Sequence, residues 1–396
     1  MYGSKLKNFF TTETTMGTHL PWRAVPGEIL FSHREKLGVP PAPGAGAGVR
    51  GLIIPEGDCG EFVLFTSRSI WKNQTGAYNR RMADALLVYN PAAGRIPTRY
   101  FIGGVIRALN DLGWRVEVAE SVNGRHTTQL ARMAAQEKFR AVFAVGGDGT
   151  AGQAASGLIG TQTALGVLPA GTTNVWAREL GIHAFVWQHL RALKQNAHLL
   201  AESEPVAVDV GLCNGQPFLM WAGIGLDALT VQKLGPRKRF EKYLSVTSYA
   251  ATTIWNATLW HGMHLRVTVN EKQIEGQYLL ALASNIRHYA VVEISPNASI
   301  NDGEMDLWLL TGSTLADAFR HMFELLAGLH VDSNMARCIP FRSARIESDT
   351  PFPIQMDGEP MLGSQNILLD ILPRRLRVLM PAEARRRLCK FPEPGN

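Results

Sequence analysis

The pattern of hydrophobic and polar residues divides the chain into three stretches. Between residues 83 and 205, short apolar runs alternate with segments of helical periodicity. The run RAVFAV at residues 140–145 is almost continuously apolar, which is typical of a parallel strand buried on both faces. Alternation at this spacing predicts βαβ units with right-handed crossovers around a parallel sheet. The predicted strands are residues 85–89, 114–121, 140–145 and 164–168, and the predicted helices are residues 98–112, 127–138, one ending at Leu158 and one ending at Leu180.

The pattern changes after residue 205, where strand-like runs dominate. Turn pairs such as Asn214-Gly215 and Asp302-Gly303 separate these runs. The predicted strands are residues 206–213, 217–221, 264–269, 277–284, 305–310, 344–347, 354–356 and 366–372, and the predicted helices lie near residues 243–260 and 314–329. We therefore expect an α/β domain over residues 83–205 and a mainly antiparallel β domain over residues 206–372.

The first 82 residues have an irregular apolar pattern. Residues 40–48 read PPAPGAGAG, a flexible linker composition, and one strand is predicted at residues 61–66. We expect residues 1–82 to form a partly disordered N-terminal extension.

Length and composition fit a two-domain globular protein. The chain has 396 residues, of which 46% are hydrophobic and 19% charged, so it carries enough apolar material for a sizeable core. The four cysteines, Cys59, Cys213, Cys338 and Cys389, show neither metal-site nor disulfide spacing. We therefore expect a reducing, cytoplasmic compartment.

The formal net charge is +6, and part of it lies in the last stretch of the chain. Residues 373–396 hold seven Lys and Arg residues against two Glu residues. A basic balance fits an anionic membrane, a phosphorylated substrate or a nucleic acid, and equally a solvated helix face. No basic stripe interleaved with aromatic residues is present, so we do not expect nucleic-acid binding.

Nothing in the sequence resembles a secretory signal or a membrane span. Residues 1–10 lack an apolar run, and the best transmembrane candidate, residues 243–263, contains Asn256 and His261. This candidate is too polar to span a bilayer at low cost. Any membrane contact is therefore expected to be peripheral.

The segment VGGDGT, Val145 to Thr150, carries the first candidate chemistry. It follows an apolar strand and opens a helix. Glycines let the backbone approach a ligand closely, and a helix N-terminus presents free N–H groups, which together favour phosphate binding. Asp148 adds a carboxylate for Mg²⁺. Taken alone, the segment is equally typical of a tight strand-to-helix turn in which Asp148 is a cap.

Two further polar loops follow neighbouring strands. YNPAAGR covers residues 89–95, and LPAGTTN covers residues 168–174. The carboxyl ends of parallel strands meet at one edge of a sheet, so all three loops should lie together. Three such loops at one edge predict a nucleotide crevice.

These segments resemble the catalytic domain of the diacylglycerol kinase superfamily, which includes soluble bacterial lipid kinases, sphingosine kinases and ceramide kinases. The resemblance continues through GIGLDA (residues 223–228), ASN (residues 283–285), SPNASINDGEMD (residues 295–306) and QMDGEP (residues 355–360). It covers residues 83 to about 381. It implies an N-terminal α/β domain like that of NAD kinases and phosphofructokinases, a C-terminal β-sandwich-like domain, and a last segment, residues 373–396, that packs back on the first domain.

The resemblance also implies an activity, the transfer of the γ-phosphate of Mg-ATP to a lipid hydroxyl, with roles for particular residues. The implied nucleotide-binding residues are Asn90, Gly94, Gly146, Gly147, Gly149, Thr150, Gly171, Thr172 and Asn174. Asp148 would contact Mg²⁺ or the γ-phosphate, and one of Asp357 and Glu359 would be the general base. Asp302 would be a ligand of a structural Mg²⁺. Taken alone, residues 357–359 and 301–303 are also typical of hairpin turns.

Two segments depart from the family pattern. Val175 stands where many members have Asp, and residues 287–295 read RHYAVVEIS where many have a glycine-rich stretch. The second segment lies on the implied acceptor side, so the sequence leaves open diacylglycerol, a sphingoid base or ceramide. It also leaves open whether the chain is a homodimer.

Two other functions remain as alternatives. An NAD kinase would share GGDGT, but the Asn-Glu pair that reads the ribose is missing after the second loop. A non-catalytic lipid-binding protein on the same fold would be expected to lack the acidic residues, yet Asp148, Asp357 and Glu359 are all present. We therefore expect a lipid kinase that works at the inner surface of the membrane.

Overall fold

The computed structural model describes residues 51–55, 62–66, 84–91, 93–94, 96–234, 260–290 and 292–390. The linker at residues 40–48 and the helix predicted near residues 243–260, except Trp260, lie outside the described residues. Strands β1 (Gly51–Pro55) and β2 (Phe62–Thr66) pair antiparallel, with Gly51 opposite Thr66, and belong to a compact unit separate from the rest of the chain. The strand predicted at residues 61–66 is therefore confirmed.

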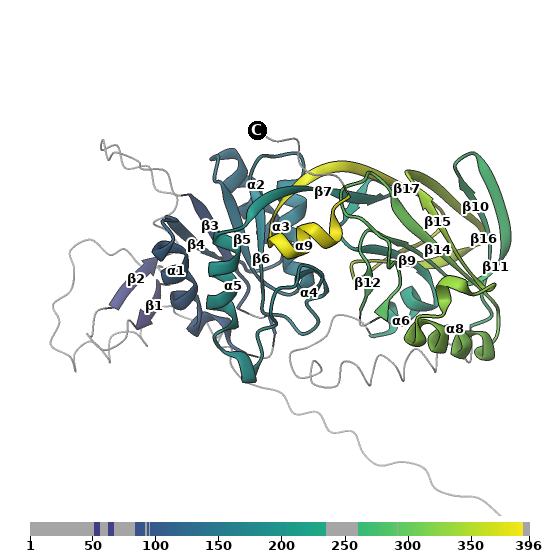
Figure 1. Ribbon diagram of the computed structural model, residues 1–396, viewed down its shortest axis with the longest axis horizontal. Helices are drawn as coiled ribbons and strands as arrows, with labels where there is room; N and C mark the ends of the chain where they lie inside the picture. Colours follow the sequence, from purple (N-terminus) through teal and green to yellow (C-terminus); the bar gives the residue numbers. More distant parts are fainter. Residues whose placement is uncertain are drawn as a thin grey trace, which may run out of the picture. The chain divides into compact units, whose positions relative to one another are not determined.

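A parallel sheet forms the first part of the second compact unit (Figure 1). Its strands run in the order β6, β5, β3, β4, and every residue of β3, β5 and β6 is buried. The strands are β3 (Ala85–Tyr89), β4 (Val116–Glu120), β5 (Ala141–Gly146) and β6 (Ala164–Pro169). The helices are α1 (Ile102–Asp111), α2 (Gly124–Gln136), α3 (Asp148–Leu158), α4 (Val175–Glu179) and α5 (Ala192–Ala201), with single 3₁₀ turns η2 (Thr98–Tyr100) and η3 (Trp187–His189). The predicted α/β architecture is confirmed.

Side chains at the helix ends account for several boundaries. The Asn123 side chain accepts a hydrogen bond from the backbone N–H of His126 at 2.9 Å and so starts α2 three residues before the predicted helix. Gly113, at φ 82°, follows α1 and lets the chain leave the helix in the left-handed conformation.

The second part is built mainly from antiparallel strands. Its core is a cluster of buried apolar side chains that includes Leu265, Leu307, Phe341 and Phe352. The strands are β7 (Glu204–Cys213), β8 (Gln216–Phe218), β9 (Trp221–Gly225), β10 (Met263–Val269), β11 (Lys272–Ser284), β12 (His288–Tyr289), β13 (Val292–Glu293), β14 (Met305–Thr311), β15 (Ala336–Phe341), β16 (Ser343–Met356) and β17 (Glu359–Met380). The helices are α6 (Leu226–Leu234), α8 (Leu315–Ala327) and α9 (Ala382–Leu388), with the 3₁₀ turn η5 (His330–Asp332). The predicted antiparallel β-rich architecture is confirmed.

Strand β17 joins the two parts. It pairs antiparallel with β16 and β7, and Val378 pairs parallel with Leu165 of β6. Within the described residues, the two parts thus share one hydrogen-bonded sheet of 13 strands. The register of β17 against β7 shifts between Leu372 and Leu376, where the chain passes through Pro373.

No described helix is long and apolar enough to cross a membrane.

Candidate functional site

The loops after β3 and β6 are packed backbone against backbone at the carboxyl edge of the parallel sheet. Gly94 adopts φ 65°, and a Cβ atom there would lie 1.9 Å from the carbonyl oxygen of Ala170. The backbone N–H of Asn90 donates to the carbonyl of Val145 at 3.2 Å. Glycine is therefore required at position 94 both by its backbone conformation and by the space available.

The loops after β5 and β6 are equally close. The backbone N–H of Ala170 donates to the carbonyl of Gly146 at 2.7 Å, and that of Gly171 donates to the same oxygen at 3.2 Å. A Cβ atom on Gly171 would lie 2.5 Å from the Cα atom of Gly147. The structure thus brings all three predicted loops together.

Asn174 stabilises the third loop internally. Its Oδ1 accepts from the N–H of Gly171 and its Nδ2 donates to the carbonyl of Gly171, both at 2.9 Å. The residue is buried and adopts φ 50°, whereas Thr172 beside it is exposed. Thr172 is therefore accessible to a ligand, while the Asn174 side chain is engaged in shaping the loop.

The N-terminus of α3 is open to an anion. Its N-cap residue is Gly147, which offers no side-chain hydrogen bond to the first turn, and Gly149 is exposed. The first N–H groups of a helix lack intrahelical partners and carry the positive end of the helix dipole. Thr150 is buried beneath the turn, where a Cβ atom on Gly146 would lie 2.3 Å from its Oγ1. This arrangement suits a phosphate group.

Asp148 links the second and third loops. Its Oδ1 accepts a hydrogen bond from the backbone N–H of Trp176 at 3.1 Å, at the start of α4. Burial raises the pKa of this carboxyl, and backbone hydrogen bonds from residues 174–176 oppose the rise. Asp148 therefore stabilises the contact between the two loops in addition to its candidate role toward Mg²⁺ or phosphate.

Asp357, Gly358 and Glu359 form the tight turn between β16 and β17. Met356 pairs with Glu359, and the two central residues have φ values of 49° and 82°, which is typical of a two-residue type I′ hairpin. The turn lies against α3. A Cβ atom on Gly152 would be 3.7 Å from Oδ2 of Asp357, and one on Gly149 would be 3.7 Å from Oε1 of Glu359. The hairpin turn therefore carries both acidic side chains to the open N-terminal turn of α3.

The Asp357 carboxylate is held by backbone groups from a distant segment. It accepts hydrogen bonds from the N–H groups of Leu219, Met220 and Trp221 at 2.7, 2.8 and 3.1 Å. Burial raises its pKa to about 6 against the effect of these bonds, and the nearby Asp148 charge adds to the rise. Glu359, by contrast, is exposed.

A buried network supports the hairpin from behind, and the sequence did not indicate it. Gln355 Oε1 accepts from the N–H of Gly358 at 2.8 Å, and its Nε2 donates to Asp227 Oδ2 at 2.9 Å. The hydroxyl of Tyr289 donates to Asp227 Oδ1. Gln355 and Asp227 belong to the segments QMDGEP and GIGLDA. The family resemblance of these segments was the sequence feature that could have pointed to the network.

Asp302, the predicted ligand of a structural Mg²⁺, lies in the second part of the chain and forms an ion pair with Lys390. Its Oδ2 accepts from Lys390 Nζ at 2.8 Å, beside a cavity of about 120 Å³ that Asp306 also lines. A cation at Asp302 would have to displace this ammonium group. In the part of the chain that the structure describes, no three or more His, Cys, Asp and Glu side chains are grouped so as to hold a metal ion.

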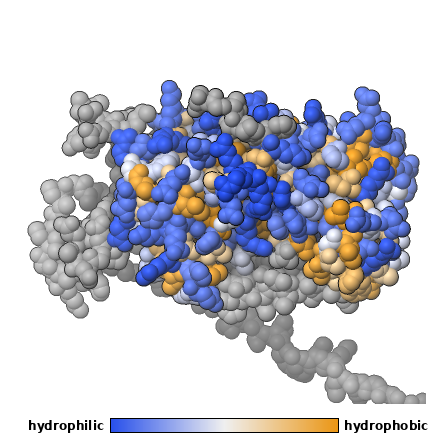
Figure 2. Space-filling model, viewed as in Figure 1, coloured by the Kyte–Doolittle hydropathy of each residue, from blue (hydrophilic) through white to orange (hydrophobic). Residues whose placement is uncertain are grey.

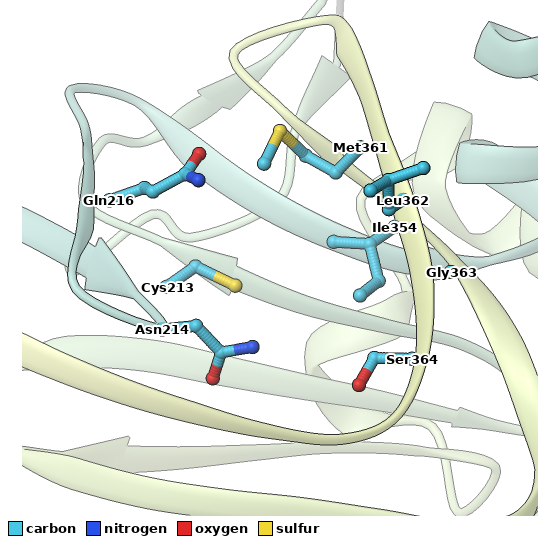
Figure 3. Close-up of a pocket in the computed structure, with 8 residues that line it drawn as sticks. All are labelled: Cys213, Asn214, Gln216, Ile354, Met361, Leu362, Gly363 and Ser364. Atoms are coloured by element: carbon cyan, nitrogen blue, oxygen red, sulfur yellow. The ribbon is translucent and has the colours of Figure 1, made fainter.

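A cavity of about 280 Å³ lies along the β16–β17 hairpin (Figure 3). Ile354, Met361 and Leu362 contribute apolar surface to it, and Asn214, Gln216 and Ser364 contribute polar groups. Pockets for small-molecule ligands usually have volumes of about 300–1,000 Å³. The cavity is therefore too small to hold a whole two-chain lipid.

Two family models match the chain. Residues 84–213 match the diacylglycerol kinase catalytic domain, and residues 222–380 match the YegS C-terminal domain, which is described as NAD kinase beta sandwich-like. The chain belongs to the diacylglycerol kinase superfamily. The residues of the candidate site fall in both matched ranges, since residues 146–150 lie in the first and residues 357–359 in the second.

Curated relatives agree with this family. The chain is 26% identical over 307 residues to the diacylglycerol kinase of Bacillus subtilis, covering 76% of this chain and 98% of the relative. It is 27% identical over 304 residues to a protein of Chromohalobacter salexigens named "Probable lipid kinase YegS-like", covering 75% and 93%. Kinase activity is thus supported at the level of the family.

Solved structures share the fold. A diacylglycerol kinase structure from Bacillus anthracis aligns with a TM-score of 0.57 and 19% identity, covering 77% of this chain and 99% of that one. Another structure from that organism aligns with a TM-score of 0.64 and 21% identity, covering 76% and 98%.

Proposed function

We propose that the protein is a lipid kinase that transfers the γ-phosphate of Mg-ATP to the hydroxyl group of a membrane lipid. One observation carries the proposal: the hairpin with Asp357 and Glu359 faces the open N-terminus of α3, where three loops of the parallel sheet meet. A donor phosphate and an acceptor hydroxyl would thus meet between a helix N-terminus and a carboxylate. Such an arrangement suits phosphoryl transfer, in which positioning and charge neutralisation supply most of the catalysis.

The nucleotide would lie on the loops of the first part of the chain, which we take as a nucleotide-binding domain of residues 83–205. The N–H groups around Gly147 and Gly149 would bind the phosphates, with Thr150 packed beneath them. Asn90 and Gly94 would line the crevice from one side, and Thr172 from the other. Gly146, Gly171 and Asn174 would hold the loops in place through the contacts already described.

The residues present fit a Mg²⁺ ion that enters with the nucleotide. Mg²⁺ in kinase sites keeps several waters and is held by phosphates and one or two carboxylates, so no cage of protein ligands is needed. Asp148 would supply a carboxylate between the loops after β5 and β6, and the bond from the N–H of Trp176 to its Oδ1 would hold it in position. When bound, the metal neutralises charge on the transferring phosphoryl group.

Asp357 is the better candidate for the general base. Three backbone N–H groups orient its carboxylate, and a pKa of about 6 lets it be ionised yet basic near neutral pH. The base takes the proton of the lipid hydroxyl as the hydroxyl oxygen bonds to the γ-phosphorus. The bond from that phosphorus to the bridging oxygen breaks, and ADP leaves with the electron pair. Glu359 would orient the acceptor or the metal from the exposed side of the turn.

The acceptor would approach over the second part of the chain, which we take as a lipid-substrate domain of residues 206–372. The acceptor class remains diacylglycerol or a sphingoid or ceramide-type lipid. Such lipids reside in membranes, so we propose that the enzyme works in peripheral contact with an anionic inner-membrane surface.

A transfer assay tests the proposal. The full chain is incubated with γ-labelled Mg-ATP and mixed micelles that each contain one candidate lipid, and products are separated by thin-layer chromatography. Label in a lipid is expected, and it identifies the acceptor. The absence of label in every lipid, with nucleotide binding intact, would favour a non-catalytic lipid-binding protein instead.

A further inference from the structure

Helix α8 exposes apolar side chains and buries polar ones. Phe319, Met322, Phe323 and Leu326 are 43%, 42%, 66% and 68% exposed. Spacings of three and four residues place these four on one face of the helix. Figure 2 shows apolar side chains gathered over α8, at the lower right of the view. Leu329 and Val331, which follow the helix, are also about half exposed, at 53% and 47%.

The opposite face of α8 is polar and well anchored. The two buried residues of the helix are His321 and Glu324. His321 Nε2 lies 2.7 Å from the carbonyl oxygen of Thr311, and Arg320 Nε donates to Glu324 Oε1 at 2.7 Å. A soluble helix normally turns its apolar face to the core, and α8 has the reverse arrangement. Among the described residues, no element covers this apolar face, and such a face is typical of an interaction surface.

The helix is preformed. Thr314 and Asp317 form a capping box at its start, and Gly328, at φ 71°, ends it. Both signals fix its limits locally. The apolar face is thus presented on a rigid element instead of arising only on binding.

Helix α8 is linked to the proposed site through intervening strands. Helix α8 packs against β13, which pairs with β12, and Tyr289 of β12 donates to Asp227. The side chain of Gln355 bonds to Asp227 and also to the N–H of Gly358, in the turn of residues 357–359. These contacts connect α8 to the network that supports the turn of residues 357–359.

We infer that the exposed face of α8 docks the enzyme on a lipid bilayer, with Phe319, Met322, Phe323 and Leu326 inserted among the lipids at the membrane interface. This inference rests on the proposed function. A lipid acceptor resides in a bilayer, so the enzyme would have to meet it there. An amphipathic helix lying in the interface plane with Phe and Leu on its buried side is a known mode of peripheral attachment.

Vesicle co-sedimentation tests the inference without requiring catalysis. The full chain is mixed with vesicles of phosphatidylcholine and phosphatidylglycerol, and the bound fraction is compared with that of the double variant Phe323→Glu/Leu326→Glu. Both side chains are exposed, so the thermal unfolding temperature should not change. We expect the variant to bind about tenfold less tightly or worse, because two apolar anchors are replaced by charges.

The control is Val122→Glu, which changes a side chain that is 77% exposed on the other part of the chain. This variant should bind vesicles as the unmodified protein does. Equal binding by the double variant, or no binding by the unmodified protein, would overturn the inference. A third result would also overturn it. If light scattering shows that the unmodified protein is a dimer and the double variant a monomer, while vesicle binding is unchanged, a second copy covers α8 instead of a bilayer. Label transfer in micelles is measured separately, so failure of docking and failure of the proposed kinase activity can be told apart.

Discussion

Gly171 and Gly147 are in direct backbone contact, and a Cβ atom on Gly171 would lie 2.5 Å from the Cα atom of Gly147 and 2.8 Å from Oδ1 of Asn174. Two loops that are far apart in the sequence therefore meet without a side chain between them. This contact fixes the position of the phosphate-binding turn relative to the third loop.

Gly171→Ala should separate these loops. Backbone atoms cannot yield as a flexible side chain would, so we expect the free energy of unfolding to fall by about 1–3 kcal/mol. Affinity for ATP should fall as well, measured by equilibrium binding. The matched control is Gly104→Ala in α1, where a Cβ atom would meet nothing within 4 Å. That variant should be stabilised by about 0.5–1 kcal/mol, and equal effects of both substitutions would contradict the account.

Asp148→Asn should reduce label transfer by at least about 10²–10³-fold, because a charged contact to the metal or the phosphates is lost. An amide oxygen can still accept from the N–H of Trp176, so the melting temperature should fall less than in Asp148→Ala. Asp148→Ala removes that acceptor too and should lower the melting temperature. Full activity in the Asn variant would remove Asp148 from the site.

The pH dependence of transfer should report Asp357. Its pKa is raised to about 6, so kcat/KM should fall as the pH drops below about 6 and the base becomes protonated. Asp357→Asn should lower kcat by about 10²–10⁴-fold and remove this acid limb, while ATP binding persists. Glu359→Gln should keep the limb. If Glu359→Gln removes the acid limb and Asp357→Asn keeps it, Glu359 is the base.

The raised pKa of Asp357 also makes the free energy of unfolding depend on pH. The pKa of Asp357 lies above its ordinary value of 3.8 in the folded chain, so the folded state holds the proton more tightly. Its contribution is most favourable below about pH 4 and is lost as the pH rises through about 6. Between these limits, the free energy of unfolding of Asp357→Asn should fall less with rising pH than that of the unmodified protein. Denaturant titrations at several pH values would reveal this, and identical slopes would count against a buried, raised-pKa carboxyl.

Glu179 connects three segments, and its removal should be costly. Its fully buried side chain accepts from His288 Nδ1 at 2.8 Å and lies 3.8 Å from Arg387 NH1 of α9. Glu179→Ala removes the acceptor of His288 Nδ1 and the carboxylate beside Arg387, and both partners are about one-third exposed, so we expect a loss of about 1–3 kcal/mol in the free energy of unfolding. Glu202→Ala, at an exposed position, should change it by about 0.5 kcal/mol or less. Similar melting curves for the two variants would refute the structural role.

Local patterns predicted much of the fold because they reflect local physics. The apolar runs at β3, β5 and β6 and the polar loops after them were visible in the sequence, and parallel pairing then placed the loops at one edge. Helix α6 was not predicted, because it is largely buried and has no polar face that would mark a helical period. In the sequence it therefore looks like a continuation of the apolar run before it. The strand predicted to end at Leu372 continues to Met380 as β17, because an irregularity with Arg374 at φ 51° accommodates Pro373.

The roles of site side chains were harder to predict. The acidic residues of the 357–359 turn were identified, but the backbone groups that hold Asp357 lie 136 to 138 residues away, so no local pattern reveals them. Asn174 was predicted to bind the nucleotide, and the structure adds that its side chain bonds its own loop. Such partners depend on tertiary contacts, which a single sequence does not display.

The most direct test of the account places two acceptors in one reaction. The unmodified full chain receives γ-labelled Mg-ATP together with NAD and with mixed micelles of the lipid that performs best in the panel. We expect label in the lipid, none in NADP, and loss of lipid label in Asp357→Asn. Label in NADP instead of lipid would mean that the crevice binds ATP but serves a different acceptor, and it would contradict the assignment of this protein as a lipid kinase.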